Sequence, residues 1–123
     1  MQSITLIRVG AILGGVGVIA GAFGAHTLAE RVEPDQLDNW GTGADYLVYH
    51  ALALVLCGVI AARGYRCNLA GWSFLSGAII FSGTLFAMVL GGAKWLGAIT
   101  PIGGVLLIIG WGALAFTRRS TEI

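Results

Sequence analysis

The chain has 123 residues, of which 57% are hydrophobic and 11% are charged, and its formal net charge is +1. Soluble domains carry about 25% charged residues, so this composition excludes a water-soluble surface, and the mean hydropathy of +0.86 indicates a membrane protein. The near-neutral charge argues against nucleic-acid binding, which needs a concentrated basic face.

Four apolar segments have the length that a helix needs to cross the hydrocarbon core, about 20 residues. They cover approximately residues 4–25, 45–62, 70–90 and 96–116. The sequence therefore predicts an all-α fold, a four-helix transmembrane bundle with a partly helical outer loop between helices 1 and 2. We expect residues 1–123 to form a single integral membrane domain.

The first segment contains one charge, Arg8, and a glycine at every third or fourth position. Arg8, the apolar core and "AFGA" also loosely fit a signal peptide, but we expect a retained span. Regular glycine spacing lines one helical face and permits close backbone approach in membranes. We expect packing within the monomer rather than across a homodimer, through Gly10, Gly14, Gly17, Gly21 and Gly24, with Gly83, Gly103 and Gly104 allowing close approach later in the chain.

The only long polar stretch is "TLAERVEPDQLDNWGTG", between the first and second segments. Glu33-Pro34 followed by Asp35 is typical of a helix start, because proline suits the first helical position and an acid suits the positive dipole end. The second helix is therefore expected to begin near Pro34 and to project above the membrane, with a bend at Gly41 and Gly43.

The two cysteines are ten positions apart, Cys57 in an apolar segment and Cys67 in a loop. On a helix this separation is about 15 Å, too far for a disulfide, which needs Cα atoms within about 7 Å. Two free thiols are expected. No CxxC or Cys/His metal spacing occurs, so no metal site is predicted.

The last helix is predicted to start at Thr100-Pro101, with Thr100 as its cap and Pro101 at the first helical position. Tryptophans lie near the predicted interfaces or helix ends, where membrane proteins carry aromatic belts. They are Trp40, Trp72, Trp95 and Trp111.

The charges orient the four spans. One side holds Arg8, Arg63, Arg66, Arg118 and Arg119, whereas the other holds Arg31 and Lys94 together with five acidic residues. The positive-inside rule then places both termini in the cytoplasm, and the chain in the cell (inner) membrane.

Polar residues gather at one depth when each helix is counted at about 1.5 Å per residue from Arg8 and Arg63. His50 falls level with residues 82–84 of the third span and 100–104 of the fourth. Ionisable groups at membrane depth are functional suspects by default. The candidate polar cluster of the outer half, ligand-binding or structural, is His26, Asp45, Tyr46, Tyr49, His50, Ser82, Thr84 and Thr100.

Three interpretations of this cluster stay open. It is a structural network in which Asp45 orients His26 and a hydroxyl satisfies His50, because membrane polar contacts often act only as glue. It is a site for a ligand, a quinone or an ion. It is a catalytic or haem site, since two histidines on adjacent helices could ligate haem axially. The residues alone assign no catalytic role and no cofactor.

Four motifs resemble a family of uncharacterised small inner-membrane proteins that includes bacterial YgdD and YwdK. They are "GAFGAH" at 21–26, "TGADYLVYHALAL" at 42–54, "FSGTLF" at 81–86 and "TPIGG" from residue 100, followed by "GW". The resemblance implies a four-span bundle in the cytoplasmic membrane and supplies no catalytic residues. The positions that match the family motifs are His26, Thr42, Gly43, Tyr46, His50, Ser82, Gly83, Thr100, Pro101 and Gly103.

Two functions are therefore expected. The first is a non-enzymatic membrane component or accessory subunit of a larger membrane complex, because four short glycine-rich helices leave little room for a chamber. The alternative is a small binding or transport protein for an ion, a proton or a lipophilic small molecule, which would use the outer-leaflet cluster. The lipid bilayer is the expected surrounding in both cases, and the sequence leaves homo-oligomerisation undetermined.

Overall fold

The computed structural model describes residues 1–120 and confirms the all-α fold. The four long helices are each long and apolar enough to cross a membrane, and a short 3₁₀ helix, η1, follows the first of them. Their bounds are α1 Ser3–His26, η1 Leu28–Glu30, α2 Pro34–Ala61, α3 Asn68–Val89 and α4 Leu96–Ala115.

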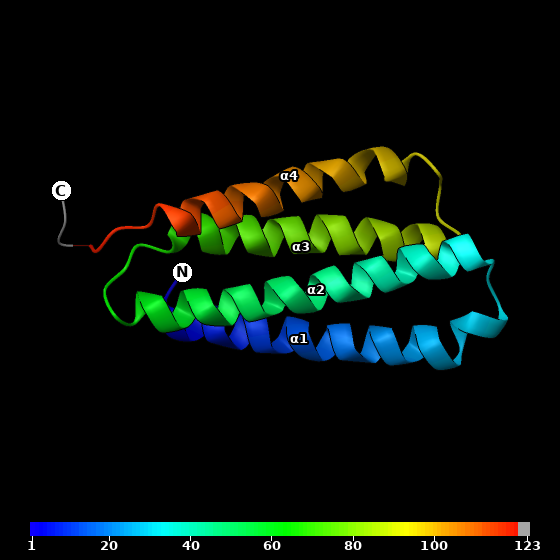
Figure 1. Ribbon diagram of the computed structural model, residues 1–123, viewed down its shortest axis with the longest axis horizontal. Helices are drawn as coiled ribbons and strands as arrows, with labels where there is room; N and C mark the ends of the chain where they lie inside the picture. The colour runs from blue at the N-terminus through cyan, green and yellow to red at the C-terminus, as the bar shows by residue number, and fades with distance from the viewer. Residues whose placement is uncertain (121–123) are drawn as a thin grey trace.

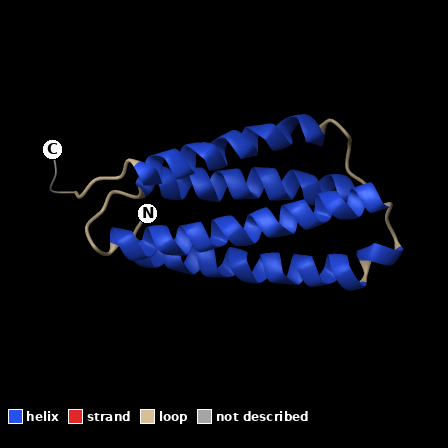
Figure 2. Cartoon of the chain, in the orientation of Figure 1, coloured by secondary structure: helices blue, strands red, loops and turns tan. Residues whose placement is uncertain are grey.

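The helices pack in chain order as antiparallel neighbours, α1 on α2, α2 on α3 and α3 on α4 (Figure 1). The N-terminus and the C-terminal end of α4 lie at the same end of the bundle, together with the connection between α2 and α3 (Figure 1). Loops are confined to the two ends (Figure 2). Because extensive contacts join only consecutive helices, α1 and α4 are the outermost members, and each is covered mainly along one side.

The α1–α2 contact depends on three glycines seven residues apart. A Cβ at Gly10 would lie 2.7 Å from the Ala51 carbonyl oxygen, and one at Gly24 would lie 2.6 Å from the Trp40 ring. Gly17 lies against Val48 in the same way. α2 can therefore pack directly against the α1 backbone at these three positions, which is how small residues promote helix association in membranes.

Not every glycine of the predicted face lies at that contact. Gly14 makes only ordinary contact with Ala51, and a Cβ at Gly21 would meet nothing within 4 Å. Each lies four residues from a contact glycine, which rotates it by about 40° around the helix. The expectation for Gly21 is therefore wrong.

The glycines predicted for close approach later in the chain also differ. A Cβ at Gly103 would lie 2.9 Å from the Gly77 carbonyl oxygen, so α3 and α4 meet there backbone to backbone. Gly104 leaves ordinary contact distance to the Phe81 ring, whereas Gly83 faces open space. Close packing of α3 on α4 therefore centres on Gly77 and Gly103.

The start of α2 agrees with the sequence, but the start of α4 does not. α2 begins at Pro34 and continues as one helix through Gly41 and Gly43. α4 begins at Leu96, and Thr100 lies inside it, with its Oγ1 3.2 Å from the Leu96 carbonyl oxygen, instead of capping a helix. Pro101 lies in the second turn, where its missing N–H leaves one carbonyl without a helical donor, and the helix continues.

The two cysteines are free, as expected, but they are not far apart. Cys57 and Cys67 are both buried in one core cluster, close enough for their thiols to interact. The predicted separation of about 15 Å assumed a continuous helix. α2 ends at Ala61, and the Tyr65 N–H already returns to the Ile60 carbonyl oxygen at 3.3 Å.

Candidate functional site

His50 lies in the middle of α2 with 5% of its surface exposed. Its Nδ1 is 2.7 Å from the Tyr46 carbonyl oxygen, and the Trp111 indole Nε1 is 3.0 Å from its Nε2. A carbonyl only accepts and an indole N–H only donates. The proton is therefore on Nδ1, Nε2 is the acceptor, and the imidazole is neutral with both nitrogens occupied.

Three helices meet around this imidazole. Its ring centroid is 5.7 Å from that of Phe74 on α3 and 5.8 Å from that of Trp111 on α4. Phe74 and Trp111 also contact each other edge-on at 4.9 Å. Gly110 makes room for this cluster, because a Cβ there would lie 2.6 Å from the Phe74 ring.

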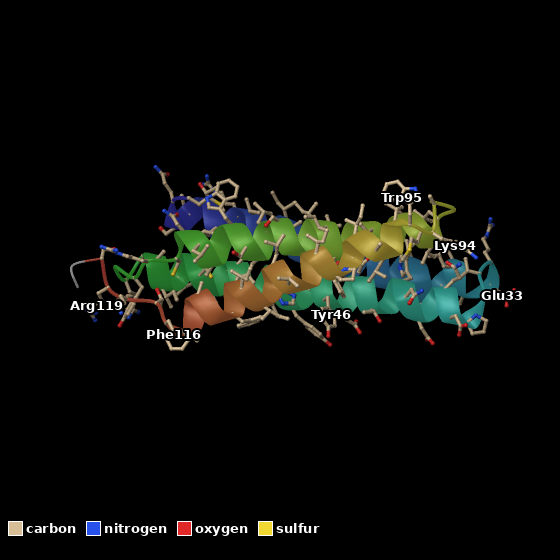
Figure 3. All side chains as sticks on the ribbon, turned by 90° about the horizontal axis from the view of Figure 1, so that it is seen from above. Glu33, Tyr46, Lys94, Trp95, Phe116 and Arg119 are labelled. Carbon is tan, nitrogen blue, oxygen red and sulfur yellow. The ribbon has the colours of Figure 1, made fainter. Side chains whose placement is uncertain are left out.

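A groove of about 380 Å³ opens beside His50 between α2 and α4. Tyr46 and Trp111 are 40% and 45% exposed and line it, and Tyr46 extends outward from the helices (Figure 3). This volume lies within the range of small-molecule sites, about 300–1,000 Å³. The full lining, mostly apolar, is Tyr46, His50, Pro101, Gly104, Val105, Leu107, Ile108 and Trp111.

The hydroxyls of the predicted cluster form two other links between helices. Ser82 Oγ donates to the Gly43 carbonyl oxygen at 2.7 Å and joins α3 to α2. Thr84 Oγ1 and Thr100 Oγ1 are 2.6 Å apart and join α3 to α4. Each of these bonds connects neighbouring helices, and none includes His50.

The remaining predicted members do not join His50. His26 is the exposed last residue of α1, and Asp45 and Tyr49 are exposed on α2. Both nitrogens of His50 are already taken by Tyr46 and Trp111. The predicted single cluster is therefore corrected to separate links, and only Tyr46 and His50 of its members line the groove.

The error came from the depth count. The count placed His50 level with residues 82–84, but its ring contacts Phe74, and Ser82 instead bonds to Gly43, two turns further along the bundle. The Tyr65 N–H bonds to the Ile60 carbonyl oxygen, so the chain has already turned back at Tyr65. The depth count instead started the third helix at Ala70, and it therefore placed α3 at the wrong height along α2. On α4 the partner of His50 is likewise Trp111 rather than a residue of 100–104.

Sequence reasoning missed Trp111 because it assigned all four tryptophans to interface belts. Trp72 and Trp95 are 56% and 65% exposed, as a belt requires. Trp40 is buried and donates its indole N–H to the Ala20 carbonyl oxygen at 2.7 Å. A signal for Trp111 was present, because it shares one face of α4 with other groove residues at helical spacing, namely Pro101, Gly104 and Ile108.

The described chain offers no obvious cofactor ligands. Within residues 1–120, no three His, Cys, Asp or Glu side chains gather as a metal site would require. In the same range, every buried side-chain nitrogen or oxygen has a hydrogen-bond partner. An iron ligated by His50 would have to displace its bond to Trp111.

Four apolar helices joined by satisfied polar links define a small polytopic membrane protein. The chain belongs to the family described as "Protein of unknown function (DUF423)", whose model matches residues 20–104. The matched segment includes Tyr46 and His50 and ends before Trp111.

Relatives in staphylococci carry the name UPF0382 membrane protein. One from Staphylococcus aureus strain bovine RF122 is 46% identical over 106 residues, which cover 85% of this chain and 87% of the relative. One from Staphylococcus epidermidis ATCC 12228 is 42% identical with the same coverage. One from Staphylococcus aureus USA300 is 47% identical, again with that coverage. No solved structure matches the chain.

Proposed function

We propose that the protein is a non-enzymatic component of the cytoplasmic (inner) membrane that acts as an accessory subunit of a larger membrane protein. The observation that carries this proposal is a second line on α1, outside its contact with α2, in which four of the five residues are glycine or alanine. Helix interfaces in membranes are enriched in small residues, so this line suits a helix of a partner.

Successive members of this line, here called the outer stripe of α1, lie four, three, four and three residues apart. All of its members are exposed, and a Cβ at Gly15 would meet nothing within 4 Å. It lies about a third of a turn around the helix from Gly17. α1 is also an outermost helix of the bundle (Figure 1). The outer stripe consists of Ala11, Gly15, Val18, Ala22 and Ala25.

Two further observations support the remaining parts of the proposal. The buried polar residues His50, Ser82 and Thr100 are engaged in bonds that join helices, which suits a structural role better than catalysis. Arg63, Arg66 and Arg118 lie near the end that holds the N-terminus, and an excess of basic residues favours the cytoplasmic side.

The test is a pull-down at native expression level through a C-terminal tag in mild detergent. We expect a stoichiometric membrane protein partner, lost with Gly15→Leu, because the larger side chain blocks backbone approach. The matched control is Gly112→Leu on α4, where a Cβ also meets open space, and it should keep the partner. A protein that returns alone, or a partner retained equally by both variants, would contradict the proposal.

A second candidate function is favoured by the groove beside His50. In this candidate function the protein binds a lipophilic small molecule in the groove, and the polar group of that molecule contacts the Tyr46 hydroxyl. The polar contact would then be one hydroxyl at the rim, since the His50 nitrogens are engaged. The same engagement makes His50 a poor carrier for an ion or a proton.

Mass spectrometry of the organic extract of natively purified protein tests this candidate. Val105→Phe places a larger side chain in the groove and should remove the bound molecule. Ile109→Phe is the control, because Ile109 is 44% exposed on α4 but does not line the groove. An extract with only bulk membrane lipid, unchanged by Val105→Phe, would count against a groove ligand.

A further inference from the structure

We propose that the end of the bundle that holds the N-terminus binds the phosphate headgroup of an anionic phospholipid. Arg66 and Arg118 bind the phosphate, and an apolar hollow between α3 and α4 receives the start of an acyl chain. This site uses other residues than the accessory contact on α1 and goes beyond the proposed function.

The first observation is that the tail after α4 is fixed onto the loop between α2 and α3. The Arg66 N–H donates to the Arg118 carbonyl oxygen at 2.8 Å, and the Ser120 N–H donates to the Gly64 carbonyl oxygen at 2.7 Å. Thr117 Oγ1 also donates to the Arg66 carbonyl oxygen. These bonds hold the backbone at both arginines, and such preorganisation lowers the entropic cost of binding.

The second observation is that two arginines line the same hollow. Arg66 and Arg118 line one hollow of about 310 Å³. Arg119 instead contacts Tyr65, with its guanidinium carbon 5.3 Å from the centre of the Tyr65 ring. The Arg66 Nη2 also donates to the Ser120 carbonyl oxygen at 3.4 Å, and a guanidinium has five N–H donors, so others remain for a ligand. Guanidinium groups match phosphate oxygens in a bidentate geometry, so two arginines on one hollow suit a phosphate.

The third observation is the amphipathic lining of that hollow. Its polar rim is Arg66, Thr117 and Arg118, whereas its walls belong to the membrane-spanning ends of α3 and α4. Phe116 is 84% exposed and lies near this end of the molecule (Figure 3). A free phosphate ion would leave such walls unused, but a phospholipid would cover them. The apolar walls are Leu69, Ala70, Ala113 and Phe116.

A second hollow lies beside the first. It has a volume of about 820 Å³, shares Arg66 and Leu69 with the first hollow, and includes Met1 and Asn68. The Met1 ammonium is held by Asn68 Oδ1 at 2.6 Å. Juxtamembrane clusters of basic residues attract anionic lipids, and here two hollows share the same central arginine.

The test is to titrate the purified protein in mild detergent with phosphatidylglycerol or phosphatidylcholine, and to measure retention by native mass spectrometry and thermal stability. We expect phosphatidylglycerol alone to be retained and to raise the Tm. The double variant Arg66→Gln/Arg118→Gln should weaken retention by about tenfold or more. The control Arg31→Gln/Lys94→Gln removes the same charge from the opposite end and should bind like the parent.

Two further measurements keep the proposal falsifiable. Phe116→Ala leaves every charge in place and should also weaken phosphatidylglycerol retention, because it removes part of the apolar wall. Inorganic phosphate at the same concentration should give no stabilisation. Equal retention of phosphatidylcholine, unchanged binding in the double variant or in Phe116→Ala, or equal protection by inorganic phosphate would each overturn the proposal.

Discussion

The indole N–H of Trp111 donates to Nε2 of His50 over 3.0 Å and thereby ties α4 to α2. These helices are not consecutive in the chain, and the main contacts of α4 are with α3. The bond also fixes the tautomer of His50, because its Nδ1 donates to the Tyr46 carbonyl oxygen. His50 therefore links two helices at the base of an apolar groove.

Trp111→Phe removes this bond and keeps most of the ring contact with Phe74. Hydrogen bonds between membrane helices contribute on average about 0.6 kcal/mol and up to about 1.7, and we expect a loss of unfolding free energy within that range. The measurement is reversible denaturation in mild detergent. Trp95→Phe is the control, because Trp95 is 65% exposed. Equal stability of the two variants would mean that the bond contributes nothing.

Gly10→Ala and Gly21→Ala should have opposite effects on stability, although both replace a glycine of α1. The new Cβ at position 10 would lie 2.7 Å from the Ala51 carbonyl oxygen and must separate the backbones. Overpacking of this kind costs about 1–3 kcal/mol. At position 21 the space is open, so the higher helix propensity of alanine should stabilise by up to about 1 kcal/mol.

Thermal denaturation of the two glycine variants, each compared with the parent protein, checks this prediction. A variant at position 10 as stable as the parent would show that α1 and α2 are less closely packed than described. Destabilisation at position 21 would instead indicate a partner on that side of α1, since nothing within residues 1–120 occupies the space.

Thr84 and Thr100 should be energetically coupled, because their hydroxyl oxygens are 2.6 Å apart. Each hydroxyl carries one proton, so one threonine donates to the other, and at most one of them also donates to a carbonyl of its own helix, Thr84 to Ile80 or Thr100 to Leu96. Replacement of either by valine keeps the shape and removes the link, so the double variant should lose less than the sum of the single losses. A coupling near the membrane average of about 0.6 kcal/mol is expected, and strict additivity would contradict it.

The sequence was sufficient for the fold because hydropathy and length alone dictate where a chain can cross a membrane. Pro34 likewise predicted the start of α2 correctly, since proline has a strong preference for the first helical turn. The same argument predicted the start of α4 wrongly at Pro101, because a proline one turn later in the helix is also tolerated. Local signals of this kind do not depend on how the helices pack.

The contacts of the candidate site depend on how the helices pack against each other, and sequence patterns do not predict that packing. Whether His50 lies opposite Ser82 or Phe74 depends on how far α3 is displaced along α2, and the loop at Tyr65 sets that displacement. A displacement of two turns leaves the hydropathy pattern unchanged but exchanges every polar partner. The approach of Cys57 to Cys67 was missed for the same reason.

We expect the free energy of unfolding to fall at alkaline pH because of the buried thiol of Cys67. Burial raises the pKa of its thiol above the ordinary value of 9.0, although hydrogen bonds with Thr117 and Cys57 partly oppose this shift. Below about pH 9 both the folded and the unfolded state keep the proton, so the stabilisation is fully present. As the pH rises above that value, the unfolded state releases the proton while the folded state holds it, and unfolding becomes easier until the folded thiol also ionises.

The free energy of unfolding, measured from about pH 7 to pH 10 for the parent protein and for Cys67→Ala, isolates this contribution. The other ionisable side chains are common to both proteins, so the difference between the two profiles reports on Cys67. We expect the parent to lose more stability than the variant above pH 9, and its Cys67 to react slowly with a thiol reagent at neutral pH. Parallel pH profiles would show that the thiol has the same proton affinity in the folded and unfolded states, and that its burial beside Cys57 does not resist ionisation.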